Sequence, residues 1–283
     1  MQRWQIGEVS ITRIIETEDK SMPPAAVLPD ATPENVLPIA WLQPHFIDEK
    51  GKLITSIYSL LVRSQDKRIV IDTCLGNDKP RIVPTWNKRQ GSFLEDIARA
   101  GFPRESVDFV VCTHLHPDHV GWNTMLVDGE WIPTFPNARY IFSAKDWEWL
   151  DKAPVTVLGD YAGDSVRPII AAGLAELVAP DFRFTDEVWL ESTPGHSPGH
   201  VSVRISSEGR QAVVTGDLMH HPCQLAHPEW CSPFDFSREQ ALDTRRSFIH
   251  RYSDEPVLVI GTHFATPCAG HIVPDGAVWR LKI

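Results

Sequence analysis

The chain has 283 residues, 42% hydrophobic and 23% charged, which is an ordinary globular composition with ample chain for a large core. Its 27 Lys and Arg against 37 Asp and Glu leave a net charge of −10, which argues against nucleic acid and anionic membranes as partners. No apolar run approaches the ~20 residues that span a bilayer, and the N-terminus lacks the apolar segment of a secretory signal. We therefore expect a cytoplasmic protein.

In the first half of the chain, strands alternate with helices. The segment 22–46 is different, because five prolines between residues 23 and 38 disfavour regular structure. This segment is an ordered arm or lid, or else a simple surface excursion. Downstream of it, apolar patterns predict strands over 57–62, 68–72, 107–112 and 139–142, with helices over 93–100 and 144–152.

The second half repeats this alternation. Its clearest element is a helix over 238–251, which Ser237 can cap and whose apolar residues recur with a period near 3.6. Short apolar runs predict strands over 188–192, 201–205, 212–214 and 257–260.

The five cysteines are odd in number and show no Cys-x-x-Cys spacing, so neither a disulfide framework nor a thiolate zinc site is expected. The histidines are more informative. The strand 107–112 runs into the sequence Thr-His-Leu-His-Pro-Asp-His, which places four metal-binding side chains within six residues. In an extended segment His114 and His116 point the same way, while Asp118 and His119 at the following turn can face a second point. This pattern suits two adjacent metal ions better than one.

Three further side chains of the same kind follow apolar strands. His196, Asp217 and His263 each stand just beyond a predicted strand, where the sites of α/β proteins usually lie. Together, five histidines and two aspartates provide enough ligands for two metal ions, with Asp217 placed to bridge them.

This set of residues, in this order, resembles the metallo-β-lactamase superfamily from about residue 57 to residue 263. The resemblance implies one α+β domain over 1–283, an αβ/βα four-layer sandwich of two mixed sheets flanked by helices. It also implies how the ligands divide: His114, His116 and His196 hold one metal, Asp118, His119 and His263 hold the other, and Asp217 bridges. Zinc is expected, with manganese, iron or cobalt as alternatives.

Three other residues are not assigned as metal ligands. Asp72 resembles the family's aspartate that orients a ligand histidine, but it also suits a cap at the end of its strand. His200 is expected to be structural, since His196 already fills the ligand position. His220 stands three residues after Asp217, where related lactonases often carry a tyrosine that polarises the substrate carbonyl. It is expected to act as a donor there or to line the pocket.

The metals indicate hydrolysis, because two divalent ions that share a water lower its pKa to about 7 and so generate hydroxide, which Asp118 can help to orient or deprotonate. The resemblance favours a small lactone or ester as substrate, with organophosphate triesters as side substrates. A glyoxalase II-like thioester hydrolase and a metal-binding sensor without activity are the alternatives. Five aromatic residues are expected either to line an apolar pocket or to pack in the core: Trp41, Phe46, Trp122, Trp230 and Phe234. The expected partners are a small-molecule substrate and a second copy in a homodimer.

Overall fold

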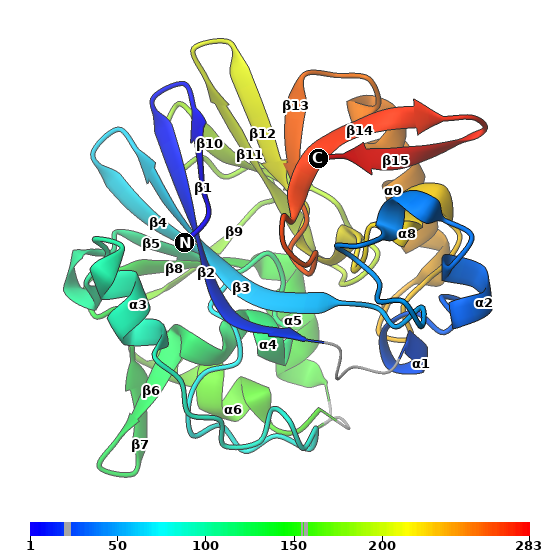
Figure 1. The fold of residues 1–283 in the computed structure, drawn as a ribbon. Helices are drawn as coiled ribbons and strands as arrows, with labels where there is room; N and C mark the ends of the chain where they lie inside the picture. The colour runs from blue at the N-terminus through cyan, green and yellow to red at the C-terminus, as the bar shows by residue number, and fades with distance from the viewer. Residues whose placement is uncertain (20–23, 154, 156–157) are drawn as a thin grey trace. The chain divides into compact units, whose positions relative to one another are not determined.

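The computed structural model describes residues 1–19, 24–153, 155 and 158–283 (Figure 1). Internal contacts divide the chain into two compact units. Unit 1 comprises Met1–Glu16 and Ile57–Trp189, and unit 2 comprises Thr17–Ser56 and Leu190–Ile283. The expectation that they form one domain stays a prediction. Met22 and Pro23, at the start of the expected arm, lie outside the described residues.

Unit 1 is built on a seven-stranded mixed sheet with the order β1-β2-β3-β4-β5-β8-β9. The pairs β1–β2 and β3–β4 are antiparallel, whereas β4, β5, β8 and β9 run parallel, so their carboxyl ends meet at one edge of the sheet. The strands are β1 (Arg3–Ile6), β2 (Val9–Asp19), β3 (Thr55–Ser64), β4 (Lys67–Ile71), β5 (Phe109–Val111), β8 (Arg139–Ser143) and β9 (Ala175–Val178).

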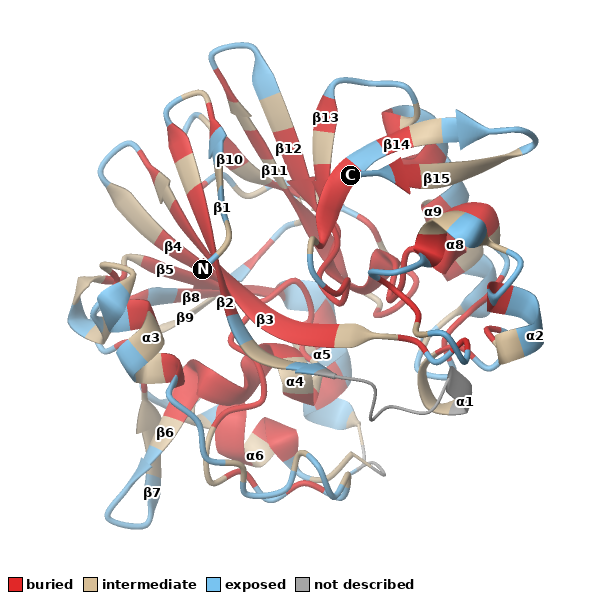
Figure 2. Cartoon of the chain, viewed as in Figure 1, coloured by how far each residue is buried: buried red, intermediate tan, exposed pale blue. Residues whose placement is uncertain are grey.

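Helices of unit 1 pack on this sheet through a continuous apolar core. Val70, Val110 and Tyr140 from three neighbouring strands belong to one buried cluster with Phe93 and Ile97 of α3, and Figure 2 shows how burial follows the strands. The remaining elements of the unit are α3 (Phe93–Arg99), η2 (Arg104–Ser106), α4 (Pro117–Val120), η3 (Gly121–Asn123), the hairpin β6 (Thr124–Val127) and β7 (Glu130–Pro133), α5 (Ala144–Lys152), α6 (Tyr161–Ser165) and α7 (Arg167–Ala171).

Unit 2 carries a six-stranded mixed sheet with the order β10-β11-β12-β13-β14-β15. Its only parallel pair among those with a described register is β12–β13, which brings the carboxyl ends of these two strands together. The strands are β10 (Val188–Ser192), β11 (Val201–Ser207), β12 (Arg210–Val214), β13 (Val257–Ile260), β14 (Ala269–Asp275) and β15 (Val278–Lys282).

The long helix of unit 2 is α9 (Arg238–Tyr252). The predicted cap is confirmed, because the Ser237 hydroxyl accepts a hydrogen bond from the backbone N–H of Gln240. Its buried face includes Ala241, Phe248 and Ile249. The shorter helices of the unit are α1 (Pro24–Val27), α2 (Pro33–Val36), η1 (Ala40–Leu42), η4 (Gly216–Leu218) and α8 (Cys223–Ala226).

Every predicted strand and helix is present; the bounds of α5, β10 and β13 are as predicted, and the other elements have shifted ends. The prolines of 22–46 are expected to disfavour regular structure, and the described residues of this segment nevertheless form three single turns, α1, α2 and η1. Pro33 opens α2, and proline is well tolerated at the first helical position because the N–H that it lacks has no partner there. None of the helices within the described part of the chain is long and apolar enough to cross a membrane.

Candidate metal centre

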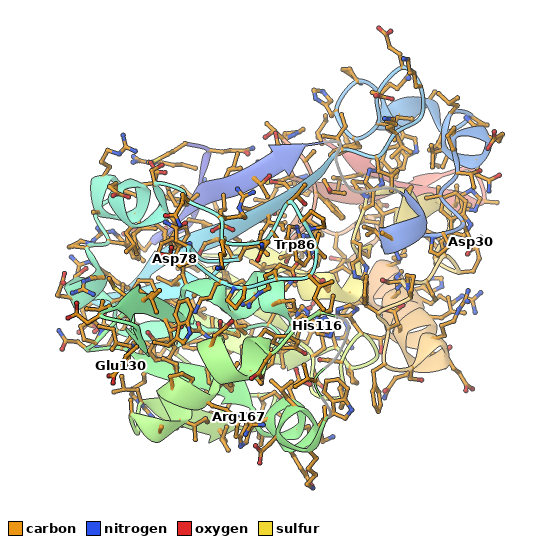
Figure 3. All side chains as sticks on the ribbon, turned by 90° about the horizontal axis from the view of Figure 1, so that it is seen from below. Asp30, Asp78, Trp86, His116, Glu130 and Arg167 are labelled. Carbon is orange, nitrogen blue, oxygen red and sulfur yellow. The ribbon has the colours of Figure 1, made fainter. Side chains whose placement is uncertain are left out.

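In unit 1, the turn after β5 and the short helix α4 that follows it carry four candidate ligands, of which His116 is labelled in Figure 3. The ring of His114 lies 4.6 Å from that of His116 and 4.0 Å from that of His119, between centroids. His119 Nε2 lies 3.8 Å from Asp118 Oδ1. His114 and His119 are buried, while His116 and Asp118 are partly exposed. The turn therefore combines fixed imidazoles with a carboxylate that solvent can reach.

Asp72, directly after β4, contacts both the segment after β5 and the expected ligand His119, and its role at a metal site stays a prediction. Its carboxylate accepts hydrogen bonds from the backbone N–H and the hydroxyl of Thr113, at 2.7 and 2.9 Å, which fixes the loop that follows β5. It also accepts from Nδ1 of His119 at 2.9 Å. A histidine that donates through Nδ1 presents the lone pair of Nε2, the form that binds a metal.

A tight crossing of two loops holds α4 in place. The backbone N–H of Gly121 donates to Cys74 O and that of Thr73 donates to His119 O, both at 2.8 Å. A Cβ at position 121 would lie 1.9 Å from the carbonyl oxygen of Leu75, so the crossing requires glycine.

In unit 2, three histidines converge on one carboxylate oxygen. The Asp217 Oδ2 atom lies 3.1 Å from Nε2 of His263, 3.4 Å from Nε2 of His220 and 3.5 Å from Nε2 of His196. All four residues are buried. They come from separate points of the chain: His196 follows β10, Asp217 and His220 follow β12, and His263 follows β13.

The hydrogen bonds behind these rings show which nitrogen faces Asp217 with a lone pair. Nδ1 of His196 donates to Asp235 Oδ1, and Nδ1 of His263 donates to the backbone oxygen of Ser56, each at 2.9 Å. A neutral ring then carries its proton on Nδ1, so its Nε2 presents a lone pair on the side of Asp217, as a metal ligand does. A ring protonated on both nitrogens would instead donate from Nε2, and Nε2 of His263 lies at hydrogen-bond distance, 3.1 Å, from Asp217 Oδ2. The arrangement therefore favours a positive charge, a metal ion or a proton, between the imidazoles and the carboxylate.

The spacing of the donors fits a divalent transition metal. Zinc binds imidazole nitrogen at about 2.0–2.1 Å and carboxylate oxygen at about 2.0–2.2 Å, so two ligands of a tetrahedral ion lie about 3.3–3.5 Å apart. The separations of 3.1–3.5 Å around Asp217 Oδ2 are close to that range. The imidazole and carboxylate donors of unit 2 therefore suit a divalent metal in chemistry and in spacing.

Two other histidines of unit 2 differ in their surroundings. Burial lowers the pKa of His220 to about 3 despite the nearby charge of Asp217, so its ring is neutral at neutral pH. His200 contacts the backbone instead: its Nδ1 lies 3.0 Å from Thr193 O, and its Nε2 accepts from the N–H of Asp217 at 2.8 Å. These contacts agree with the structural role expected for His200.

The sequence did not point to Asp235. Its side chain is fully buried in the loop between α8 and α9, with Oδ2 accepting from the N–H of Ser232 and lying 3.8 Å from the Arg245 guanidinium. Burial raises the pKa of its carboxyl, but the hydrogen bond from His196 and the nearby positive groups outweigh that effect and hold the pKa below its usual value. Asp235 lies 39 residues from His196, and only the two phenylalanines that flank this charge mark the position in the sequence.

The five aromatic residues expected at the pocket have different surroundings. Trp122 is buried in the core of unit 1, stacked on Phe93 at 5.4 Å, with its indole N–H donating to Glu16. The other four belong to unit 2, where Phe46 and Trp230 are buried, Trp41 is half-buried and Phe234 is exposed. Their role in a substrate pocket stays a prediction.

Comparison with known proteins places these residues in a family context. A model described as the Metallo-beta-lactamase superfamily matches residues 54–272. An N-acyl homoserine lactonase from Bacillus cereus is 24% identical over 174 residues, which is 56% of this chain and 61% of that protein. The N-acyl homoserine lactonase AttM from Rhizobium radiobacter is 29% identical over 129 residues, 43% of this chain and 44% of that protein. The chain thus matches at most about three-fifths of the length of these two relatives.

Solved structures resemble the chain over nearly its whole length. AidC, described as a dizinc quorum-quenching lactonase in complex with a product, superposes with a TM-score of 0.80 at 19% identity, covering 99% of this chain and 96% of its own. A hydrolase named AbOPH, described as in the beta lactamase superfamily, gives a TM-score of 0.79 at 25% identity, with 99% and 97% covered. The expected α+β fold class is confirmed.

Proposed function

Because the chain belongs to the metallo-β-lactamase superfamily, we propose that it is a metal-dependent hydrolase that opens a small lactone or ester. The observation that carries this proposal is the convergence of buried imidazoles on Asp217 Oδ2, with the Nδ1 atoms of His196 and His263 already hydrogen-bonded. A metal-dependent enzyme needs ligands with a fixed orientation, and hydrogen bonds at the ring nitrogens that do not bind the metal provide it.

We propose that each chain binds two divalent ions and that zinc is the preferred metal. The ligand order along the chain supports this number, as does the dizinc description of AidC. The family resemblance assigns the ligands His114, His116, Asp118, His119, His196, Asp217 and His263. When bound, the ions would lower the pKa of a shared water to about 7 and polarise the bond to be cleaved.

The residues of the chain would divide the remaining work. Asp72 and Asp235 keep His119 and His196 in the tautomer that binds metal. Asp118 is partly exposed beside His119, so it can accept a proton from the attacking water or orient it. These roles need no serine or cysteine nucleophile.

The relatives support a lactone as substrate. The two similar proteins named above are both N-acyl homoserine lactonases, and AidC is described with N-hexnoyl-L-homoserine as product. The net charge of −10 argues against polyanions. A neutral lactone with an apolar tail fits both observations, and the five aromatic residues remain candidates to hold that tail.

A substrate panel on the metal-loaded full chain tests the proposal. The panel holds acyl-homoserine lactones, simple γ-lactones, aryl esters, an organophosphate triester and S-lactoylglutathione, each with and without chelator. We expect lactones to give the highest kcat/KM and chelator to abolish it. A large preference for the thioester would favour a glyoxalase II-like enzyme. Metal binding without turnover of any member would favour the sensor.

Three sequence-based expectations stay predictions: the cytoplasmic location, the homodimer and the exclusion of nucleic acid as a partner. Each can be measured separately, by fractionation, by sedimentation and by a gel-shift assay.

A further inference from the structure

We propose that His220 is a metal ligand, so that unit 2 offers three imidazoles and a carboxylate instead of two imidazoles and a carboxylate. The inference rests on the metal binding assumed in the proposed function, but not on any substrate. It departs from the resemblance, which places no metal ligand three residues after the bridging aspartate.

The geometry around Asp217 does not separate His220 from the two expected ligands. Its Nε2 lies 3.4 Å from Asp217 Oδ2, between the 3.1 Å of His263 and the 3.5 Å of His196. One ligand atom each from His196, Asp217 and His220 lie within 4.8 Å of one another. By distance alone, an ion that His196 and Asp217 hold would also be within reach of His220.

The orientation of the ring supports the same conclusion. The ring of His220 lies edge-on to that of His196, with centroids 4.8 Å apart, and parallel to that of His263, with an interplanar angle of 6°. The three rings thus present Nε2 to Asp217 Oδ2 in two orientations, one shared by His220 and His263 and the other that of His196. An ion bound to Asp217 Oδ2 would therefore be within reach of Nε2 of His220 as well as of the histidine that the resemblance assigns to that ion.

The local backbone keeps His220 in this position. Its N–H donates to Oε1 of Gln224 at 2.7 Å, and the amide of Gln224 donates in turn to Trp230 O at 2.7 Å. His220 is only 4% exposed and Gln224 is fully buried. These contacts hold the residue where its Nε2 faces Asp217.

The surroundings of Nδ1, the other ring nitrogen of His220, do not determine which nitrogen carries the proton. Within the described residues, Nδ1 of His220 is buried and has no hydrogen-bond partner, in contrast to Nδ1 of His196 and of His263. No protein group therefore fixes the proton on either nitrogen. A metal at Nε2 would fix it on Nδ1, whereas a hydrogen bond from Nε2 to Asp217 would fix it on Nε2.

Metal titration of matched variants separates these two states. In the full chain, His220→Phe removes the donor, His220→Gln keeps an amide that can donate to Asp217, and His221→Phe is the control. His221 is the adjacent buried histidine, and its Nε2 contacts Phe46 O. The readouts are zinc affinity, by competition with a chromophoric chelator, and the visible spectrum of the cobalt-loaded protein.

If His220 is a ligand, both His220 variants lose at least about 10- to 100-fold in affinity, the loss typical when even an outer partner of a ligand is removed. Their cobalt spectra change as well, while His221→Phe keeps both properties. Wild-type affinity in His220→Gln would overturn the proposal in favour of a hydrogen bond to Asp217. Unchanged affinity and spectrum in His220→Phe, with a lower kcat, would overturn it in favour of a substrate donor.

A second measurement requires no variant and so does not depend on folding. X-ray absorption of the cobalt-loaded wild type counts imidazoles, and six per two ions support the proposal whereas five contradict it. The two results that support the proposal, the loss of metal affinity and the imidazole count, are both measured without a substrate. An inactive protein with six imidazoles would therefore refute the proposed hydrolase and keep this inference, and an active one with five would do the reverse.

Discussion

The backbone N–H of Asp217 donates a 2.8 Å hydrogen bond to Nε2 of His200, a buried histidine whose other nitrogen faces Thr193. The expected bridging ligand is thus held by a histidine that is not itself an expected ligand. The bond passes from the start of β11 to the turn after β12, and it fixes the main chain of Asp217 while the carboxylate faces the three imidazoles.

We expect His200→Phe to lower the free energy of unfolding of the metal-free protein by about 1–3 kcal/mol, because it leaves the buried N–H of Asp217 without an acceptor. His200→Gln should lose less, since its carbonyl oxygen can accept the same bond. Denaturant unfolding in chelator measures both, with the exposed His271→Gln as control. Equal stability of His200→Phe and wild type would contradict the role assigned to the bond.

Asp235 gives a prediction about metal affinity. Asp235→Asn should weaken zinc binding by about 10- to 100-fold, because the carboxylate that accepts from His196 makes that imidazole a better ligand. The charge is removed while the shape is retained. Chelator competition measures the change, and Asp243→Asn on the exposed face of α9 serves as control. A Kd equal to that of wild type would show that His196 does not need this partner.

The expected ligands could be predicted from the sequence because each follows a predicted strand, and an apolar run that ends in His or Asp is a local signal. Asp235 gave no such signal, since its partner His196 is distant in sequence and only the folded chain brings them together. Trp122 shows the same limit: as a single aromatic residue beside the metal motif it suits a pocket or a core, and the stack on Phe93 is visible only in three dimensions.

Lys79 gives a pH dependence that is separate from the metal ligands. Its ammonium group is buried over the ring of Trp131 at 3.6 Å and donates to the backbone oxygen of Asp164, whose carboxylate pairs with Arg81. Burial lowers the pKa of Lys79 to about 7, although the charge of Asp164 opposes this shift. In the unfolded chain the pKa returns to about 10.4.

Between pH 7 and 10, then, the unfolded chain binds more protons at Lys79 than the folded chain does. The free energy of unfolding should therefore rise with pH across this window, by at most about 1.4 kcal/mol per pH unit. Below pH 7 Lys79 is charged in both states, so the folded state bears the full cost of burying that charge. The difference in unfolding free energy between wild type and Lys79→Met should therefore grow in favour of wild type as the pH rises. Lys152→Met, at an exposed position, is the control. A difference that does not vary with pH would refute the shift.

The substitution Asp217→Asn should raise the free energy of unfolding in the absence of metal and lower it in the presence of metal. In the metal-free protein, the Asp217 carboxylate faces imidazole lone pairs at 3.1–3.5 Å, whereas an asparagine amide can donate to one of them. We expect Asp217→Asn to be more stable than wild type in chelator at pH 8, by about the 0.5–1.5 kcal/mol of one hydrogen bond. With zinc at about 100 times its Kd, wild type gains about 2.7 kcal/mol per site and should become the more stable protein. Denaturant unfolding of both proteins in the two buffers measures this crossover. If Asp217→Asn is less stable than wild type in both buffers, the carboxylate is stabilising by itself and these donors do not require a bound metal.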